Sequence, residues 1–157
     1  MNMTEQNAQQ DRPVFRMQKM YVKDLSFESP NAPNIYLAQN PEPKVDFNLQ
    51  LNSQKIDDDH REVSLAITAK VMDKNADDTV MFVVEIEHAG VFLMKNIPEE
   101  HIEKVLAIDC PLMLFPFTRQ VVSQVSVDGG FMPFLMEPIN FISLYENARR
   151  EQAEQKQ

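Results

Sequence analysis

Nucleophilic or metal-binding chemistry in this sequence would depend on three histidines and one cysteine. They are His60, His88, His101 and Cys110. A hydrolytic triad needs a nucleophile, a histidine and an acid, and no histidine lies near a nucleophile in sequence. His88, His101 and Cys110 also lack the short ligand spacings of zinc sites. We therefore expect no catalytic residues, no metal and no other cofactor, and interpret these side chains as ordinary core or surface groups.

Paired carboxylates are numerous, and most of them occur where turns or helix starts are expected. Asp57–Asp59, Asp77-Asp78 and Glu99-Glu100 suit solvated turns or a helix N-terminus. Glu85 and Glu87 differ, because they interrupt an apolar strand pattern and point to the same face. This pair is either a solvent-facing row or a docking surface for a basic partner.

The composition excludes several classes of ligand-binding protein. With three glycines in 157 residues, the sequence contains no GxGxxG, GxxxxGK[ST] or GxSxG, the signatures of dinucleotide folds, P-loop NTPases and α/β-hydrolases. A net charge of −9 argues against nucleic-acid binding and favours basic partners. Residues 57–103 hold twelve acids and four bases, so we expect one localised acidic face.

The cellular context follows from what the chain lacks. A single cysteine cannot form an intramolecular disulfide, and the N-terminus has no apolar segment of the secretory type. No run approaches the roughly 18 apolar residues of a membrane span. We expect a soluble, cytoplasmic protein with no direct membrane insertion.

Methionine and aromatic residues are abundant, with ten Met, ten Phe and three Tyr. Several occur in proline-punctuated connections and not in regular elements, among them Tyr36, Phe131, Met132, Phe134 and Met136. Such flexible or aromatic side chains fill irregular gaps, and they also recur on surfaces that bind many partners. They either plug the core beneath long loops or line an apolar groove for extended peptide.

The apolar pattern predicts strands first and helices afterwards, an α+β order. Alternation predicts four strands, at 15–27, 45–51, 63–71 and 79–88. A long ordered loop at 29–43 carries four prolines. Helical spacing predicts a helix from Pro98 to Cys110-Pro111, one from Pro116 to Gly129-Gly130, and a short one from Asn140 to about Arg150.

One domain is expected at this length, covering residues 13–148, with flexible polar tails at 1–12 and 149–157. The strand at 79–88 is apolar on both parities, so both of its faces must be covered. Either a second subunit or a helix that wraps round the sheet supplies the second cover.

Four segments, in this order, resemble the bacterial protein-export chaperones of the SecB family. They are Tyr21–Pro33 (YVKDLSFESPNAP), Pro41–Lys44, Cys110–Arg119 and Pro138–Phe141. The resemblance implies a four-stranded antiparallel sheet with helices packed on one side, assembled as a homotetramer that is a dimer of dimers. It implies no enzymatic activity. It also implies that the chain binds unfolded secretory precursors, keeps them translocation-competent and delivers them to the SecA ATPase for export across the inner membrane.

The resemblance also assigns candidate sites. The SecA-binding acids fall on Asp24, Glu28 and Glu85. The positions tied to tetramer assembly fall on Phe82, Val84, Ile86 and His88. Client-binding positions fall on Val45, Phe47 and Leu49, and we add to this groove the aromatic residues Tyr21, Phe27, Tyr36, Phe131 and Phe134.

Two functions of other classes stay open. The first is an acidic binding module or adaptor for one folded partner, without catalytic activity. The second is an enzyme of unfamiliar type, whose groups meet only in space. Because no nucleotide site is visible, a chaperone of this composition would release clients by handover to a partner and not by hydrolysis.

Overall fold

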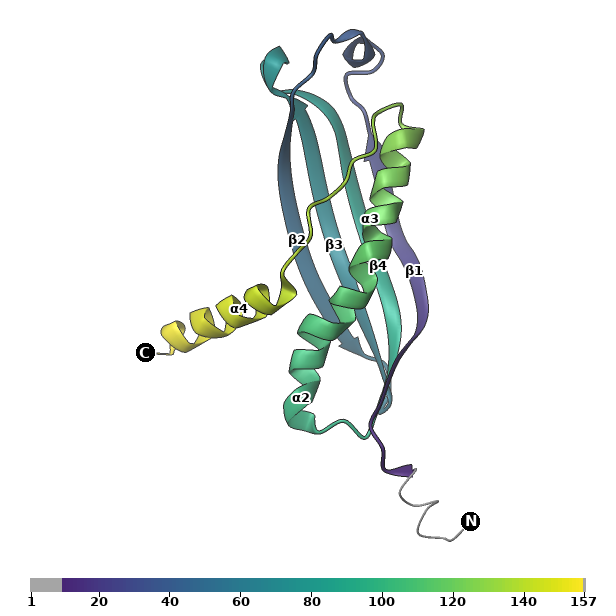
Figure 1. Ribbon diagram of the computed structural model, residues 1–157, viewed down its shortest axis with the longest axis vertical. Helices are drawn as coiled ribbons and strands as arrows, with labels where there is room; N and C mark the ends of the chain where they lie inside the picture. Colours follow the sequence, from purple (N-terminus) through teal and green to yellow (C-terminus); the bar gives the residue numbers. More distant parts are fainter. Residues whose placement is uncertain (1–9, 157) are drawn as a thin grey trace.

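The computed structural model describes residues 10–156, so most of the predicted N-terminal tail and Gln157 lie outside the described residues. Four strands precede the helices, which confirms the predicted α+β class (Figure 1). The strands are β1 (Val14–Glu28), β2 (Pro43–Lys55), β3 (His60–Asp73) and β4 (Thr79–Lys95). They form one antiparallel sheet in the order β1-β4-β3-β2, and the helices lie on one side of it.

Alternating side chains build the buried side of this sheet. On β3, Val63, Leu65 and Ile67 are at most 1% exposed, and they face the helices together with the residues opposite them on β4, which are Gly90, His88 and Ile86. We call this the inner face, and the opposite side of the sheet the outer face. The loop between β1 and β2 includes a short 3-10 turn, η1 (Asn34–Leu37), and a second turn, η2 (Lys74–Ala76), joins β3 to β4.

β1 departs from strict alternation at two β-bulges. The register with β4 shifts between Met17 and Lys19 and again between Val22 and Asp24. Each bulge inserts one residue and reverses the alternation, so the side chains between the two bulges face opposite to simple parity, and those after the second bulge return to it. β2 has no such shift along its pairing with β3, and its parity holds from end to end.

The helical layer differs from the sequence prediction, because one long helix replaces two. α2 (Glu99–Lys104) continues through a π-helical turn, η3 (Val105–Asp109), into α3 (Cys110–Asp128). Pro111 does not end the helix. The wider π turn precedes it, with the Cys110 N–H donating to the Val105 carbonyl, and this relieves the crowding that a proline ring imposes on the carbonyl four residues before it.

Pro116 lies inside α3 and not at a helix start. A proline in a helix interior costs about 3 kcal/mol, whereas burying one large apolar side chain contributes roughly 1.5–3 kcal/mol. The inner side of α3 buries Leu114, Phe115 and Val122 against the sheet. Their burial outweighs the local cost, which explains why proline spacing alone misplaced the helix ends.

The helix from Glu99 to Asp128 is long and apolar enough to span a membrane by length and composition, with a window of mean hydropathy 1.4. The sequence expectation missed this because it divided the segment into two helices. The inner side of the helix is packed into the sheet, with Leu114 and Val122 fully buried. We interpret it as a core helix, since such helices have the same composition.

After α3, an irregular connection (residues 131–140, the connector) crosses the inner face toward β2 and leads to α4 (Phe141–Gln155). Asn140 caps α4 by accepting a hydrogen bond from the Ser143 N–H. α4 projects away from the sheet (Figure 1). It runs past the predicted end near Arg150, so much of the predicted C-terminal tail is helical, and the side chains from Glu146 to Gln155 are exposed.

The residues predicted for the tetramer interface lie on the inner side of β4. Phe82, Val84, Ile86 and His88 are all buried within the single chain, on the face that α3 covers. In the single chain these side chains are part of the core, and their role in assembly stays a prediction. The two alternatives for the second cover concerned the other face of this strand, and the helices of the described residues lie on one side of the sheet only.

His88 provides a test of this buried layer. Its Nδ1 lies 2.7 Å from the hydroxyl of Thr118, which itself donates to the Leu114 carbonyl, so Nδ1–H donates to Thr118. Burial lowers the pKa of His88 from its usual value near 6.5. The folded state therefore binds fewer protons than the unfolded state, and stability rises with pH.

We expect this contribution of His88 to be complete above the unfolded pKa, near 6.5, and to be lost as the pH falls below it toward the lowered folded pKa. Denaturant midpoints measured between pH 5 and 7.5 check this. His88→Asn, which keeps a donor toward Thr118, should reduce the increase of the denaturant midpoint with pH. Replacing the exposed His101 should leave this pH dependence unchanged. An unaltered slope in His88→Asn would contradict the assignment.

Candidate functional site

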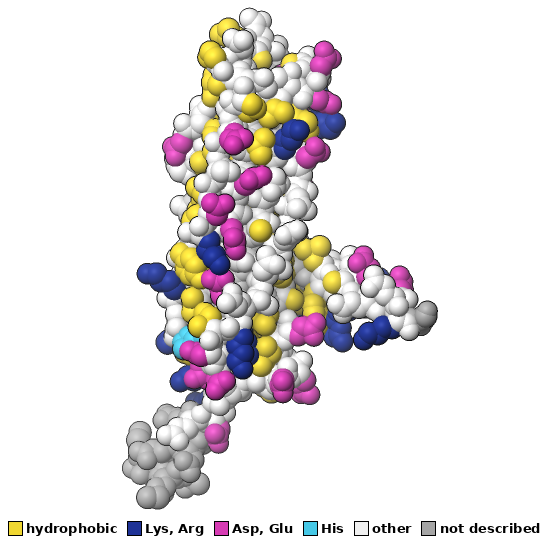
Figure 2. Space-filling view, turned by 180° about the vertical axis from the view of Figure 1, so that it is seen from behind, with side chains coloured by type: hydrophobic (Ala, Val, Ile, Leu, Met, Phe, Trp, Pro, Cys, Tyr) yellow, Lys and Arg dark blue, Asp and Glu magenta, His cyan; other side chains and the backbone are white. Residues whose placement is uncertain are grey.

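The outer face of the sheet carries a row of acids on β1 and β4. In the register, Asp24 lies opposite Glu87, Ser26 opposite Glu85, and Glu28 opposite Val83, so these acidic side chains share one face. Figure 2 shows acidic side chains in a column along this side of the molecule. Among the described residues, Asp24, Glu28 and Glu85 have no hydrogen-bonded or ion-paired side-chain partner. We call these three residues the open acids.

Two further acids of the outer face are paired within the chain. Lys23 Nζ lies 3.0 Å from Glu62 Oε1 and 3.7 Å from Glu87 Oε1. The other carboxylate oxygen of Glu62 accepts a hydrogen bond from the Tyr21 hydroxyl. This bond lowers the pKa of Glu62, and burial together with Glu62 raises the pKa of Tyr21 to about 12. Tyr21, Lys23, Glu62 and Glu87 form what we call the clamp.

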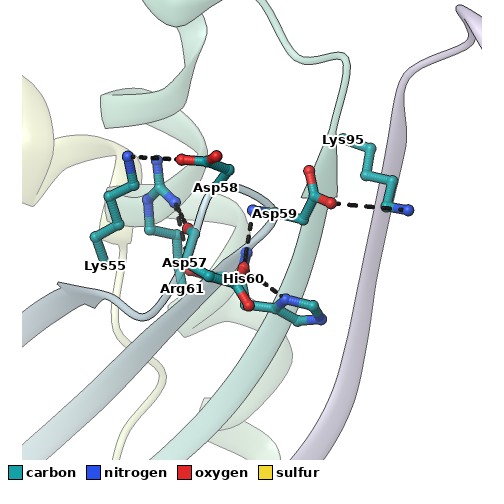
Figure 3. Close-up of polar contacts among 7 residues, drawn as sticks. All are labelled: Lys55, Asp57, Asp58, Asp59, His60, Arg61 and Lys95. Atoms are coloured by element: carbon teal, nitrogen blue, oxygen red, sulfur yellow. Dashed lines mark hydrogen bonds and ion pairs between the residues drawn. The ribbon is translucent and has the colours of Figure 1, made fainter.

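The acids at the β2–β3 turn are also satisfied locally (Figure 3). Asp57 Oδ1 accepts from the backbone N–H groups of Asp59 and His60 and lies 2.7 Å from His60 Nδ1, which lowers the pKa of Asp57. Lys55 pairs with Asp58 at 3.4 Å, and Lys95 pairs with Asp59 at 3.8 Å. These contacts fix the turn, so we assign it no binding role.

The single acidic face expected from residues 57–103 therefore requires a correction. The acids of that stretch divide among the β2–β3 turn, the outer face, α2 and the β3–β4 turn, and Asp73 is buried as a cap for the N–H groups of Glu42 and Asn75. Two of the three open acids, Asp24 and Glu28, lie outside the stretch on β1.

On the inner face, β2 and the connector enclose a hollow. Val45 and Phe47 line one side of it, and the connector contributes Phe134, Leu135 and Met136 among others. Its volume is about 510 Å³, and all of its lining residues except Glu137 are apolar. The predicted Leu49 lies on the same face of β2 but is half-buried against the core and does not line the hollow.

An aromatic cluster extends from this hollow toward the end of α3. Phe134 meets Phe82 edge-on with ring centroids 6.0 Å apart, and Phe82 contacts Phe131 at 4.8 Å and Phe27 at 5.5 Å. Tyr36 packs on Phe131 at 5.2 Å and donates a hydrogen bond to the Gly129 carbonyl. The structure thus packs four aromatic residues that were predicted for the groove, Phe27, Tyr36, Phe131 and Phe134, around the buried Phe82 and beside the hollow.

The methionine and aromatic side chains of this region divide into buried and partly exposed groups. Met136 and Phe82 are buried as core plugs, and Phe131 and Phe134 are half-buried. The exposed apolar side chains beside them are Met132 at 86% and Leu135 at 66%. Leu135 was missed by the sequence analysis, because the connector has no periodicity from which to predict which side chains point outward.

Tyr21 does not belong to this surface, which corrects its assignment to the groove. Tyr21 pairs with Ala89 of β4, and its side chain lies on the outer face, where its hydroxyl donates a hydrogen bond to Glu62. Simple parity places Tyr21 with Leu25 and Phe27, but the bulge between Val22 and Asp24 reverses the facing of the strand.

Gly129 controls the packing of the aromatic cluster. Its φ of −78° and ψ of 1° are accessible to alanine, so backbone entropy alone would make Gly129→Ala stabilising by about 0.4–1 kcal/mol. A Cβ there would lie 2.2 Å from Phe27 Cζ, however. Overpacking of this kind costs about 1–3 kcal/mol, so we expect net destabilisation.

Denaturant unfolding measures this effect of Gly129→Ala. Adding Phe27→Leu should relieve the contact, so the double variant should lose less stability than the sum of the two single variants. Additive losses would show that Phe27 does not oppose the new methyl group.

Neither a reactive cysteine nor a metal-binding group occurs among the described residues. Cys110 is fully buried, and burial with Asp109 nearby raises its pKa to about 12, so it is a poor nucleophile and a poor metal ligand. No group of three or more histidine, cysteine, aspartate or glutamate side chains within residues 10–156 could hold a metal ion.

Comparison with known proteins decides the family. The family described as "Preprotein translocase subunit SecB" matches residues 8–152. The chain is similar to the "Protein-export protein SecB" of Desulfotalea psychrophila, with 60% identity over 98% of each chain, and to that of Magnetococcus marinus, with 46% identity over 99% of this chain and 97% of the relative. The chain belongs to the SecB family.

The fold agrees with this membership. A SecB-like chaperone of Mycobacterium tuberculosis, solved in complex with a peptide from an antitoxin, superposes with a TM-score of 0.62 at 13% identity, over 80% of this chain and 91% of that one. As a SecB-family member, the chain is a non-catalytic protein-export chaperone, which confirms the predicted family, function and lack of enzymatic activity.

In this SecB-family chain, the outward side of α3 is unusually apolar for a surface. Leu112, Met113 and Phe117 are 46%, 38% and 43% exposed. Phe82, Val84, Ile86 and His88 support the opposite side of the same helix. A change at those buried residues would therefore alter this exposed surface only by displacing α3.

Proposed function

We propose that this chain holds unfolded secretory precursors on its inner-face apolar surface and hands them to SecA, which docks on the open acids of the outer face. The observation that carries the proposal is the separation of the two surfaces. The hollow lies between β2 and the connector on the helix side, and the open acids lie on β1 and β4 on the other side. A client and SecA can then be bound at the same time.

The client surface has the chemistry that unfolded polypeptide requires. Exposed apolar groups of an unfolded chain gain roughly 1.5–3 kcal/mol each on full burial, and the hollow, Met132, Leu135 and the aromatic cluster offer several such contacts. Contacts of this kind are tolerant of sequence. Many unrelated precursors are therefore suitable clients.

The acidic surface suits a basic segment of SecA. Asp24, Glu28 and Glu85 form no ion pair with another described residue, so pairing with lysine or arginine does not first require breaking an internal contact. Charge complementarity of this kind raises the association rate and makes binding depend on salt. Handover to SecA then replaces nucleotide hydrolysis by this chain as the means of release.

We also propose that the chain works in the cytoplasm as a homotetramer, a dimer of dimers. The exposed apolar side of α3, with Leu112, Met113 and Phe117, supports this assembly, because a surface of this kind is normally covered. Phe82, Val84, Ile86 and His88 then act indirectly, by holding α3 in place.

The proposal is tested by offering the chain several unrelated proteins, each in a reduced, unfolded form and in its folded form. We expect binding to most of the unfolded forms and to none of the folded forms. Binding to one folded protein only would instead support an adaptor and would overturn the chaperone proposal.

A further inference from the structure

The clamp divides the outer-face acids of β1, β3 and β4 into two groups. Lys23 holds Glu62 and Glu87 through its ammonium group, while Asp24, Glu28 and Glu85 face solvent without a described partner. Glu87 lies directly opposite Asp24 in the β1–β4 register, so the boundary between paired and open acids falls between two adjacent side chains. One lysine therefore determines where the free negative charge of β1 and β4 ends.

Lys23 reaches this position because of the bulge between Val22 and Asp24. The bulge inserts Lys23 between Val22, which faces the helices opposite His88, and Asp24, which faces outward opposite Glu87. Bulges commonly re-aim a side chain in this way. Here the inserted residue reaches two carboxylates on two different strands, Glu62 on β3 and Glu87 on β4.

Glu62 is the better-held member of the pair. Its side chain is only 16% exposed, and both of its carboxylate oxygens are engaged, one by Lys23 and one by the Tyr21 hydroxyl. Glu87 is 37% exposed and is held by the longer contact with Lys23. Loss of the Lys23 charge would therefore free Glu87 completely and leave Glu62 with the tyrosine alone.

We propose that Lys23 is a specificity-determining residue of the outer face, which restricts a lysine- or arginine-rich partner segment to the open acids by neutralising Glu62 and Glu87. The inference rests on the proposed docking of SecA at this face. A basic segment that slides along the acids toward Tyr21 meets the Lys23 ammonium in place of free carboxylates. Only the register centred on Asp24, Glu28 and Glu85 is then favourable.

The test measures SecA binding to the full chain carrying Lys23→Gln, at several salt concentrations. Because up to two further carboxylates become available, we expect binding about 2- to 30-fold tighter at low salt, with a steeper dependence on salt. Lys23→Arg keeps the clamp and should behave as the unmodified chain. Native mass and far-UV circular dichroism confirm that each variant is folded and assembled as before.

Lys70→Gln is the matched control. Lys70 is an exposed lysine of the same face, it lies opposite Asp46 in the β2–β3 register, and its replacement changes the net charge by the same amount. A larger gain for Lys23→Gln than for Lys70→Gln supports the proposal. An equal gain would show a general charge effect, and unchanged or weaker binding by Lys23→Gln would show a purely structural lysine; either result overturns the proposal.

Failure of the docking proposal itself gives a different result. If neutralising Asp24, Glu28 and Glu85 leaves SecA binding unchanged, the outer face is not the docking surface, and the role of Lys23 falls with it. If that neutralisation weakens binding while Lys23→Gln has no effect of its own, only the inference about Lys23 is wrong.

Discussion

Neutralising the three open acids together is expected to weaken SecA binding by about 10- to 100-fold while client binding stays unchanged. The variant is Asp24→Asn, Glu28→Gln and Glu85→Gln, which preserves side-chain shape. Each exposed charge pair contributes roughly 0.2–1 kcal/mol, and a tenfold change in affinity corresponds to about 1.4 kcal/mol. Titration of SecA at low and at physiological salt measures the loss, and the difference between variant and unmodified chain should shrink as salt increases.

The control removes the same charge elsewhere. Glu99, Glu100 and Glu103 are exposed acids on α2, on the helix side of the sheet. Their replacement by glutamine changes the net charge by the same three units and should leave SecA binding nearly unaffected. A similar loss in both variants would mean that overall charge, and not the outer face, governs the encounter. Equal loss of SecA and client binding by the first variant would mean that the open acids are structural.

Removing apolar side chains from the hollow is expected to give the largest loss of client binding. We choose Phe47→Ser with Leu135→Ser, because the two residues line the same hollow from β2 and from the connector and are 43% and 66% exposed. Each side chain is expected to contribute about 1–2 kcal/mol to a bound client, since burial is incomplete, so the pair should weaken binding by roughly 30- to 1,000-fold. Fluorescence titration with a reduced, unfolded client measures the change.

Leu51→Ser is the matched control for Phe47→Ser. Leu51 lies on the same face of β2, and its exposed fraction of 37% is similar to the 43% of Phe47. It does not line the hollow. Client affinity should change little in this variant, and SecA affinity should be unchanged in both. If Leu51→Ser weakens client binding as much as Phe47→Ser, clients bind along the whole exposed edge of β2 and the hollow has no special role.

The alternation of odd and even positions correctly predicted which face each side chain of a strand points to where the strand has no bulge. It gave the wrong face where a bulge shifts the register. β2 pairs with β3 without a shift, so the alternation of Val45, Phe47 and Leu49 correctly placed all three on the inner face. In β1 the same reasoning placed Tyr21 with Phe27, and the bulge after Val22 puts them on opposite faces. The position of a bulge in β1 depends on how β1 pairs with β4, and the pattern of apolar residues within β1 alone does not show this pairing.

The helical half shows a second limit of local rules. Proline positions predicted two helices, because the local cost of an interior proline is well defined. The energy that overrides it comes from burying the inner side of α3 against strands far away in sequence. Charge behaves similarly: the acids concentrated between residues 57 and 103 spread over several parts of the surface, and the open acids are brought together only by the β1–β4 pairing.

The most direct test of the whole account is a native mass measurement of the chain mixed with SecA and a reduced, unfolded client. Because the client surface and the open acids lie on opposite faces of one sheet, we predict a complex that contains all three components, built on a tetramer of this chain. The Asp24, Glu28 and Glu85 variant should retain the client and lose SecA from this complex. If SecA and client are instead mutually exclusive, so that only two-component complexes form, the two surfaces overlap and the separation on which the proposed function depends is contradicted.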